Sequence, residues 1–439
     1  MIRVLRLAGG RRLILSWDTM LLCIFLLIMT SENGGGGYGW ANAAKDFGAG
    51  VRLHYSREPR MYFKGSGKSF LTVPKCLTSG EAAKWLIEFL EAIRPDLVKD
   101  GLYKELLPMV DEILTKDFKL MCEEWDEISV KQWVEARSKS PSIKYLFTAL
   151  MAGYCWTGNA DYTWENGSFG KGAVMFRIWI GGHGSMAVAI PDPLDGICMP
   201  IANAIRDKYE CEIRCNQDVS QVIIEGGKAT GVAVKQEGQQ DKIIRADRVI
   251  IATTWLDYPN LFKIMPASLA KNMSEPLKQK MGGVFLVTGL NDTVKLDGAF
   301  FLIYDPKTGS SIQGGCAQNI EQPWNIPEGK QLVWSYSTKS EEEFNRLGLD
   351  GIAAQMNENF EEIYPGFKNA IEFQSPPKGA AYPSHYRFSS LPKIRQKSPD
   401  VKGLYFAGEC TWPMYGQITD GTAGTGANVA RMILDADSL

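Results

Sequence analysis

The chain has 439 residues, and its 48 basic and 50 acidic side chains leave a formal net charge of −2. With 45% hydrophobic and 22% charged residues, the composition is that of a globular protein rather than a disordered, collagen-like or coiled-coil chain. A charge near zero provides no electrostatic footprint for nucleic acid, so we expect no such partner. At about 150 residues per domain, the length predicts two or three domains.

Cysteine and histidine are too scattered to predict a metal site or a disulfide framework. The nine cysteines are an odd number and contain no C-x-x-C pair. The three histidines, His54, His183 and His385, lie far apart in the sequence. We therefore expect no metal ion, and a chain compatible with the cytoplasm.

The apolar run MLLCIFLLIM, at 20–29, has three interpretations. Arginines precede it, as in a signal peptide, but no small-residue cleavage site follows, and a spanning helix needs about 20 apolar residues. A buried strand that ends in the glycines at 34–37 also fits a short apolar run. The third interpretation is a disordered or wrongly assigned start of the chain.

Residues 80–152 have the apolar spacing of helices. In EAAKWLIEFLEAI, at 81–93, Trp85, Phe89 and Leu90 recur at intervals that place them on one helix face. Ser129 precedes VKQWVEARS, and its hydroxyl is typical of a helix N-cap. A helical block is therefore predicted in the first half of the chain.

From Cys211 the period changes to that of strands. The segment EIRCNQDVSQVIIE, then Gly226-Gly227, then KATGVAVKQ predicts a strand, a tight turn and a strand. The apolar run RVIIATT, at 248–254, is typical of a strand buried on both faces in a parallel sheet. Other strands are predicted at 242–245, 283–290, 299–304 and 331–337, and a helix at 341–363.

The C-terminal part combines a strand with a glycine-rich helix. The segment VKGLYFAGE, at 401–409, predicts a short apolar strand, and TAGTGANVARMIL, at 422–434, predicts a helix. Glycine inside a helix costs up to about 1 kcal/mol relative to alanine, so something must approach this backbone closely. That neighbour is either a phosphate or developing anion at the helix N-terminus, or a closely packed strand. The predicted packing face carries Ala423, Ala427, Ala430 and Leu434, and the glycines of the first turn are Gly421, Gly424 and Gly426.

Together these segments resemble the FAD-dependent amine-oxidase/phytoene-desaturase superfamily, which includes flavoproteins similar to carotenoid isomerase and retinol saturase. GLYFAGE and DGTAGTGANVA are similar to the closing patterns of that family, with Thr422 at the usual Ala and Thr425 at the usual Ser. Four further segments resemble the family's: ISVKQWV (128–134), GGHGSM (181–186), CNQDVSQVIIEGGKATGVAVK (215–235) and RADRVIIATT (245–254). The resemblance covers the chain from about residue 50 to its end.

The resemblance implies an α/β fold, in which a discontinuous, Rossmann-like FAD-binding domain carries an inserted α+β substrate domain. The FAD-binding domain is expected at 1–79, 175–260 and 386–439. The substrate domain is expected at 80–174 and 261–385. The predicted helices and strands agree with this plan.

The resemblance also assigns cofactor-binding residues. Glu409, after Gly408, matches the acidic residue that faces the ribityl–pyrophosphate region, where it would accept hydrogen bonds from hydroxyls. Val219 matches the valine whose backbone contacts adenine, although an ordinary strand valine explains the residue equally well. The helix start whose N–H groups point at the flavin N1/C2=O edge is matched by Gly421, Thr422 and Ala423.

Substrate-lining residues are less specific. Trp412 and Tyr415 follow the acidic motif and would stack on an apolar substrate, and His183 lies between glycines. Aromatic packing and an ordinary hydrogen-bonded histidine explain the same residues. Many members of the family need no protein acid or base, because the flavin carries the redox chemistry, so no catalytic residue is predicted.

The sequence departs from the family at its N-terminus. No G-x-G-x-x-G occurs in residues 1–33. If 20–30 is the second strand of the cofactor domain, Glu32 would bind ribose. The absent turn removes part of the cradle for the pyrophosphate, and two or three lost contacts would weaken FAD binding by about a hundredfold or more.

Two functions follow from these observations. The first is an FAD-dependent oxidoreductase that transfers a hydride between flavin and an apolar isoprenoid, a polyene or an amine. The second is a flavin-poor remnant that binds an apolar ligand or another protein. We expect a cytoplasmic location, with peripheral membrane contact as a further expectation.

Overall fold

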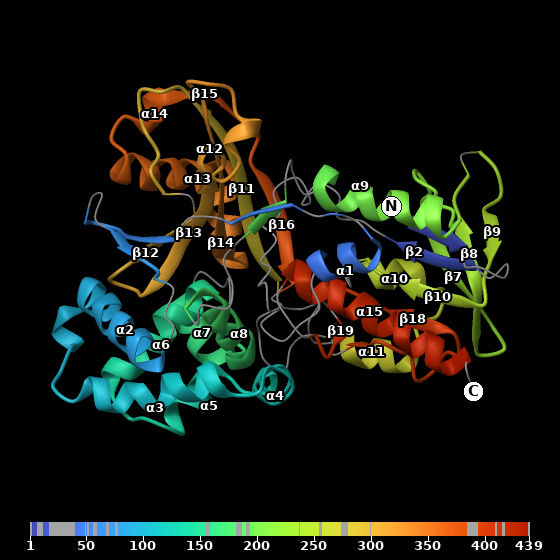
Figure 1. Ribbon diagram of the computed structural model, residues 1–439, viewed down its shortest axis with the longest axis horizontal. Coiled ribbons are helices and arrows are strands. Elements are labelled where there is room, and N and C mark those ends of the chain that lie inside the picture. Colours follow the sequence, from blue (N-terminus) through green and yellow to red (C-terminus); the bar gives the residue numbers. More distant parts are fainter. Residues whose placement is uncertain are drawn as a thin grey trace.

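The structure, a computed structural model, has two parts (Figure 1). One part is a large sheet with helices below it, and the other is a smaller sheet crossed by the C-terminal helix. The residues described are 2–6, 12–16, 40–48, 50, 52–55, 59–66, 70–74, 78–154, 159–180, 187–189, 194–236, 238–253, 257–273, 280–298, 300–383, 394–408, 411–414 and 418–437.

The small sheet contains four strands within the described residues, in the order β1-β2-β10-β18. β10 (Arg248–Ile251) is parallel to both β2 (Arg12–Ser16) and β18 (Leu404–Phe406), and β1 (Ile2–Arg6) is antiparallel to β2. The strands predicted at 248–254 and 401–409 are confirmed as β10 and β18. A parallel sheet of this kind fits a Rossmann-like FAD-binding fold.

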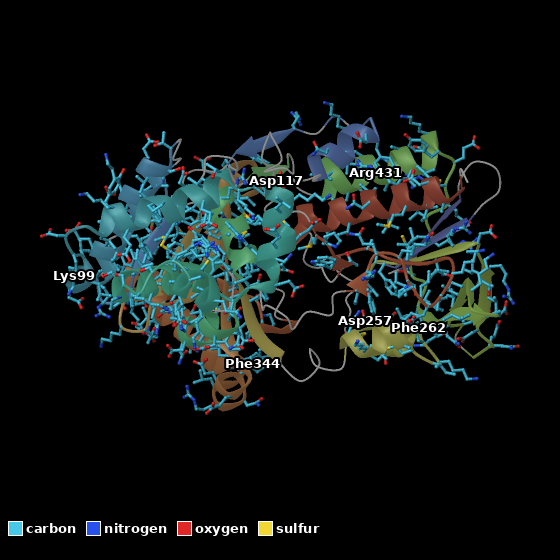
Figure 2. All side chains as sticks on the ribbon, turned by 90° about the horizontal axis from the view of Figure 1, so that it is seen from below. Lys99, Asp117, Asp257, Phe262, Phe344 and Arg431 are labelled. Carbon is cyan, nitrogen blue, oxygen red and sulfur yellow. The ribbon has the colours of Figure 1, made fainter. Side chains whose placement is uncertain are left out.

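Apolar side chains cover both faces of the small sheet. On one face, Val429 and Ile433 of α15 (Ile418–Asp437) pack against Ile250 and Tyr405. On the other, Val249, Ile251 and Phe406 pack against a three-stranded meander and against α10 (Tyr258–Leu261) and α11 (Ala267–Met273). Figure 2 shows this layering, with Arg431 of α15 on one side and Asp257 and Phe262, which flank α10, on the other.

The meander confirms the strands predicted after Cys211, except that the first of them begins at Val219 and not at Glu212. It consists of β7 (Val219–Glu225), β8 (Lys228–Val234) and β9 (Lys242–Arg245), paired in sequence order. Gly226 and Gly227 join β7 to β8 with φ of 55° and 73°, a turn that glycine adopts without steric cost. Lys402, before β18, hydrogen-bonds to this turn region, which ties the meander to the small sheet.

The large sheet has eight strands within the described residues, in the order β15-β11-β14-β13-β12-β4-β5, with β16 also paired to β11. The predicted strands at 283–290, 299–304 and 331–337 are confirmed within β11, β12 and β14. The strand bounds are β4 (Arg60–Phe63), β5 (Phe70–Thr72), β11 (Lys280–Leu290), β12 (Phe300–Asp305), β13 (Ser310–Ala317), β14 (Gln331–Ser340), β15 (Ile371–Gln374) and β16 (Lys378–Pro383).

The predicted helical block covers one face of the large sheet. Trp85, Phe89 and Leu90 are buried on one face of α2, as the spacing predicts. Ser129 caps α5 through a reciprocal capping box with Gln132, as its position predicts. The helices are α2 (Ser79–Ile93), α3 (Leu102–Thr115), α4 (Phe118–Glu124), α5 (Val130–Glu135), α6 (Pro141–Tyr154), α7 (Ala160–Asn166) and α8 (Phe169–Trp179).

The predicted helix at 341–363 is confirmed as α13 (Glu341–Ile363), although Gly348, with φ of 66°, interrupts it. Ile352, Ala353 and Met356 of this helix pack on the face of the large sheet opposite the helical block. Within the parts of the chain that the structure describes, no helix is long and apolar enough to cross a membrane. The remaining α-helices and strands of the described residues are α1 (Trp40–Asp46), β3 (Leu53–Tyr55), β6 (Ala187–Ala189), α9 (Met199–Asn203), α12 (Gln318–Glu321), α14 (Phe367–Ala370), β17 (Ile394–Arg395) and β19 (Thr411–Trp412).

Three segments depart from the predicted domain bounds. β4 and β5 fall in the range 1–79, assigned to the cofactor domain, yet β4 pairs with β12 of the large sheet. α8 crosses the predicted bound at 175 and packs wholly in the helical block, while α11, assigned to the substrate domain, packs under the small sheet. The resemblance implied those bounds as continuous ranges of the chain, whereas these segments pack with strands that lie far away in the sequence.

Candidate functional site

The parallel strands of the small sheet bring three chain segments to one edge. β2 ends at Ser16, β10 at Ile251 and β18 at Phe406, and the three strands run in the same direction. In open α/β sheets, ligands bind in the crevice beyond the carboxyl ends of such strands. This edge is therefore the candidate site.

Gly408 shapes the chain where it leaves β18. Its φ is 124°, a backbone conformation that residues other than glycine rarely adopt. No heavy atom lies within 4 Å of the position that a Cβ would occupy. Thr411 holds the turn, because its N–H and its Oγ1 both donate to the carbonyl oxygen of Gly408, at 3.1 and 2.8 Å. The backbone at Gly408 is therefore fixed, and open space lies beside it.

Thr425 links this turn to α15. The N–H of Gly408 donates to Thr425 Oγ1 at 2.8 Å, and that hydroxyl donates to the carbonyl oxygen of Thr422 at 2.7 Å. Thr425 is 1% exposed. Sequence reasoning noted the hydroxyl at this position but did not assign it a role, since the bond joins residues that lie in separate elements.

The helix start differs from the prediction. α15 begins at Ile418, four residues before the predicted start at Thr422, because nothing in residues 418–420 breaks a helix. Gly421 therefore ends the first turn, and Thr422 and Ala423 lie in the second. The unpaired N–H groups of a helix belong to its first turn, which here includes Gly421 but not Thr422 or Ala423. The contact of these three residues with flavin stays a prediction.

The packing face of α15 also differs from the prediction. The buried positions are Gly421, Gly424, Thr425, Val429 and Ile433, which follow one another at spacings of one to four residues along one side of the helix. Ala430 is exposed, and Leu434 is 68% exposed. The β-branched Val429 and Ile433 bury more apolar area than alanine does, so they decide which face meets the sheet. Gly421 lies on this buried face.

The other predicted residues lie on different elements. Val219 begins β7, at the end of the hairpin away from its turn, and its side chain packs in the core with Val234. Trp412 lies in β19, which pairs with β17, and the next carbonyl, of Pro413, accepts a hydrogen bond from Gln396. Four predicted residues lie outside the described residues: Glu32, His183, Glu409 and Tyr415.

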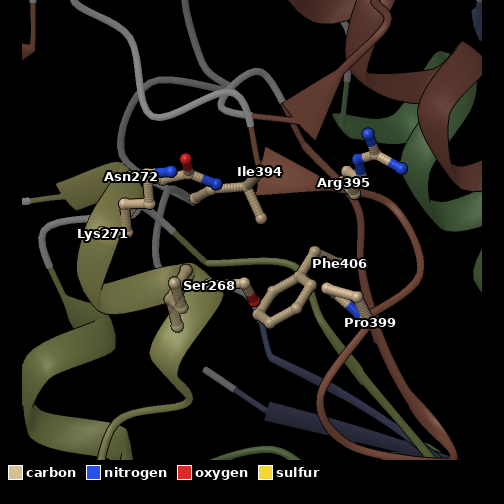
Figure 3. A pocket seen from close by; sticks show the side chains of 8 residues that line it. Ser268, Lys271, Asn272, Ile394, Arg395, Pro399 and Phe406 are labelled. Carbon is tan, nitrogen blue, oxygen red and sulfur yellow. The ribbon is translucent and has the colours of Figure 1, made fainter.

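A cavity of about 210 Å³ lies on the meander side of β18 (Figure 3). Phe406, Ile394 and Asn272 line it, and the guanidinium of Arg395 points away from the other labelled side chains. Asp400 Oδ2 accepts a hydrogen bond from the Ser268 N–H at 2.7 Å, and hydrogen bonds from Ser268 lower the pKa of Asp400. The cavity contains none of the predicted site residues.

The arrangement suits the binding of an anionic group at this edge of the sheet. The strand ends, the open backbone at Gly408 and the beginning of α15 form an edge where a helix dipole favours negative charge. These features suit the close approach of a large, partly anionic cofactor to the backbone.

Known structures share this architecture. No family model matches the sequence, and no curated protein matches it significantly. An oxidoreductase from Methanosarcina mazei superposes with a TM-score of 0.64 at 17% identity, over 92% of this chain and 87% of that one. The chain has the fold of that protein.

Two further structures support the same conclusion. The PF1083 protein from Pyrococcus furiosus gives a TM-score of 0.54 at 13% identity, over 96% of this chain and 91% of that one. Cyclohexylamine oxidase from Brevibacterium oxydans gives 0.52 at 12% identity, over 94% and 87%. At such low identities these comparisons establish the fold and leave the activity open.

Replacing Thr425 by valine is expected to loosen the candidate site. The variant keeps the shape of the side chain but leaves the N–H of Gly408 without its acceptor, which costs about 1–3 kcal/mol. We expect the free energy of unfolding in urea to fall by that amount, and FAD binding to weaken. Thr425→Ser retains the hydroxyl and should behave like the original protein. Equal stability of the valine and serine variants would contradict the role of this bond.

Proposed function

We propose that the chain is an FAD-dependent oxidoreductase. The observation that carries the proposal is the edge at which β10 and β18 end, where Thr425 ties the Gly408 turn to α15. The family resemblance assigns the acidic residue of the cofactor site to Glu409, which follows Gly408 in the sequence. In this proposal, the helical block and the large sheet form an inserted substrate domain.

The roles of the residues follow from their chemistry. The carboxylate of Glu409 would accept hydrogen bonds from the ribityl or ribose hydroxyls. The first turn of α15 would direct N–H groups and a partial positive charge at the cofactor. FAD, when bound, supplies the hydride chemistry. The surrounding protein would orient the substrate and keep water away from the reacting atoms.

The substrate class has two candidates. The shared fold of cyclohexylamine oxidase supports an amine, and the resemblance to phytoene-desaturase-like proteins supports an apolar isoprenoid or polyene. Anaerobic mixing of the FAD-loaded protein with members of each class tests the proposal, because a true substrate bleaches the flavin in a single turnover. If no amine, isoprenoid or polyene changes the oxidation state of the bound flavin, the proposed activity is wrong.

The flavin-poor alternative keeps one argument in its favour. The sequence has no G-x-G-x-x-G in residues 1–33, and β2 is entered through an antiparallel hairpin with β1. A site that lacks the glycine turn retains fewer contacts to the pyrophosphate. Because these contacts are fewer, we expect FAD binding that is saturable but weak.

A further inference from the structure

The cavity on the meander side of β18 lies between a polar helix face and an apolar wall. Ser268, Lys271 and Asn272 occupy positions i, i+3 and i+4 of α11, so their side chains share the helix face that lines the cavity. Ile394 of β17 and Phe406 of β18 line it from the other side. The cavity therefore combines hydrogen-bonding groups with apolar surface, as sites for small organic ligands do.

The two ends of the cavity differ in polarity. Figure 3 shows Lys271 and Asn272 together at one end, near Ile394. Ser268 lies at the other end, next to the ring of Phe406. A ligand that fills the cavity would therefore meet an ammonium and a carboxamide at one end and an aromatic surface at the other.

The aromatic end is held in place by the core. Phe406 is 3% exposed, and its ring packs on Tyr258 with centroids 5.5 Å apart. Pro399 continues the apolar surface beside Phe406. Because the ring of Phe406 is already ordered, a second flat ring can stack on it without a further loss of side-chain entropy.

The charges around the cavity favour an anionic ligand. Among the described residues that line it, Lys271 and Arg395 are cationic and none is a carboxylate. The guanidinium of Arg395 points away from the cavity, so one ammonium remains to meet a ligand, which suits a single negative charge. An ammonium has three donors and a carboxamide has two, so Lys271 and Asn272 can each donate to a ligand in addition to a protein partner.

A neighbouring carboxylate sets the orientation of such a ligand. Asp400 Oδ2 accepts a hydrogen bond from the Ser268 N–H at 2.7 Å, and Ser268 lies beside the ring of Phe406. An anionic group at that end would be repelled by Asp400. The anionic group of the ligand therefore belongs at the end that Lys271 and Asn272 form.

We propose that this cavity binds a small aromatic monocarboxylate, with its ring against Phe406 and its carboxylate at Lys271 and Asn272. A cavity of about 150 Å³ can hold benzene, so one of about 210 Å³ has room for a ring with a short acidic side chain. None of the lining residues belongs to the predicted cofactor site. Binding here is therefore independent of the proposed oxidoreductase function.

A ligand-detected NMR titration with three matched probes tests the site. Phenylacetate carries both the ring and the charge, phenylacetamide retains the ring without the charge, and cyclohexylacetate retains the charge without a flat ring. We expect phenylacetate to bind with a dissociation constant of about 1 mM or lower. Phenylacetamide should bind about tenfold more weakly, which corresponds to the loss of a hydrogen bond to a charged group. Cyclohexylacetate should also bind more weakly than phenylacetate.

Variants assign these preferences to individual side chains. Lys271→Met should weaken phenylacetate by about tenfold and leave phenylacetamide almost unchanged. Phe406→Leu should remove the preference for phenylacetate over cyclohexylacetate, and the preference in the original protein tests the ring contact if this variant does not fold. Lys263→Met removes an exposed lysine between α10 and α11, outside the cavity, and should change none of the dissociation constants.

The same titration in the presence of FAD separates this site from the proposed cofactor site. We expect FAD to leave the dissociation constant of phenylacetate unchanged, and displacement by FAD would show that the cavity belongs to the cofactor site. No binding of phenylacetate up to about 10 mM, equal binding of phenylacetamide, or unchanged affinity in Lys271→Met would also overturn the assignment. A protein that binds phenylacetate as expected but no FAD keeps this site while the proposed function fails.

Discussion

Replacing Trp133 by alanine should lower the free energy of unfolding by about 3–5 kcal/mol, the usual cost of removing a large aromatic side chain from a core. Trp133 is 1% exposed. Its ring stacks on Phe169 with centroids 3.8 Å apart, and Arg137 covers it at 4.1 Å. The cavity left by alanine would therefore separate α5 from α8. Urea unfolding followed by circular dichroism measures the loss.

Two variants define the control for Trp133. Trp133→Phe retains a ring against Phe169 and should lose clearly less stability than the alanine variant. Trp324→Ala removes an exposed tryptophan and should stay within about 0.5 kcal/mol of the original protein. A loss below about 1 kcal/mol for Trp133→Ala would show that the helical block does not depend on this stack.

Replacing Glu409 by alanine should weaken FAD binding without unfolding the protein. A hydrogen bond to a charged group contributes about 1.5–3 kcal/mol, which corresponds to a rise of about ten- to 150-fold in the dissociation constant. The prediction rests on the position of Glu409 directly after Gly408 in the sequence, where the family resemblance expects the acidic residue. Fluorescence titration with FAD measures it.

Glu409→Gln is the matched variant, because the amide oxygen still accepts a hydrogen bond while the charge is lost. It should bind FAD more tightly than Glu409→Ala and less tightly than the original protein. Glu328→Ala removes an exposed carboxylate in the loop before β14 and should have no effect. If FAD binds the alanine variant with an unchanged dissociation constant, Glu409 does not belong to the site.

Local patterns predicted the elements whose signals are long or chemically specific. The seven-residue strands of the meander flank a Gly-Gly pair, and the capping box of Ser129 and Gln132 needs only a spacing of three. Such elements are determined by residues close in sequence. They were predicted because backbone conformation and periodicity suffice to specify them.

Pairings between distant segments could not be predicted in this way. β4 and β5 are only four and three residues long, and their place beside β12 depends on contacts across more than 200 residues. The polar network around Asp297 also joins residues far apart in the sequence. The Oδ1 of Asp297 accepts a hydrogen bond from the Tyr364 hydroxyl at 2.9 Å and forms a salt bridge with Arg60 Nη1 at 2.9 Å. Burial raises the pKa of Tyr364, which keeps its hydroxyl protonated as a donor.

The candidate site was predicted unevenly for a related reason. Motif spacing located Gly408 and the start of the final helix to within a turn. It missed the hydrogen bond from Gly408 to Thr425, and it assigned the wrong face of α15 to the sheet. In a glycine- and alanine-rich helix the hydrophobic period is weak, so two β-branched residues, Val429 and Ile433, decide the packing.

Reconstitution with FAD tests the central claim most directly. The purified protein is titrated with FAD and binding is followed by difference absorption spectroscopy, which also gives the stoichiometry. We predict the absorption bands of an oxidised protein-bound flavin, saturable binding that approaches one FAD per chain, and weaker binding in Thr425→Val. A spectrum without flavin bands, together with no saturable binding at any FAD concentration, would contradict the assignment of this chain as a flavoprotein.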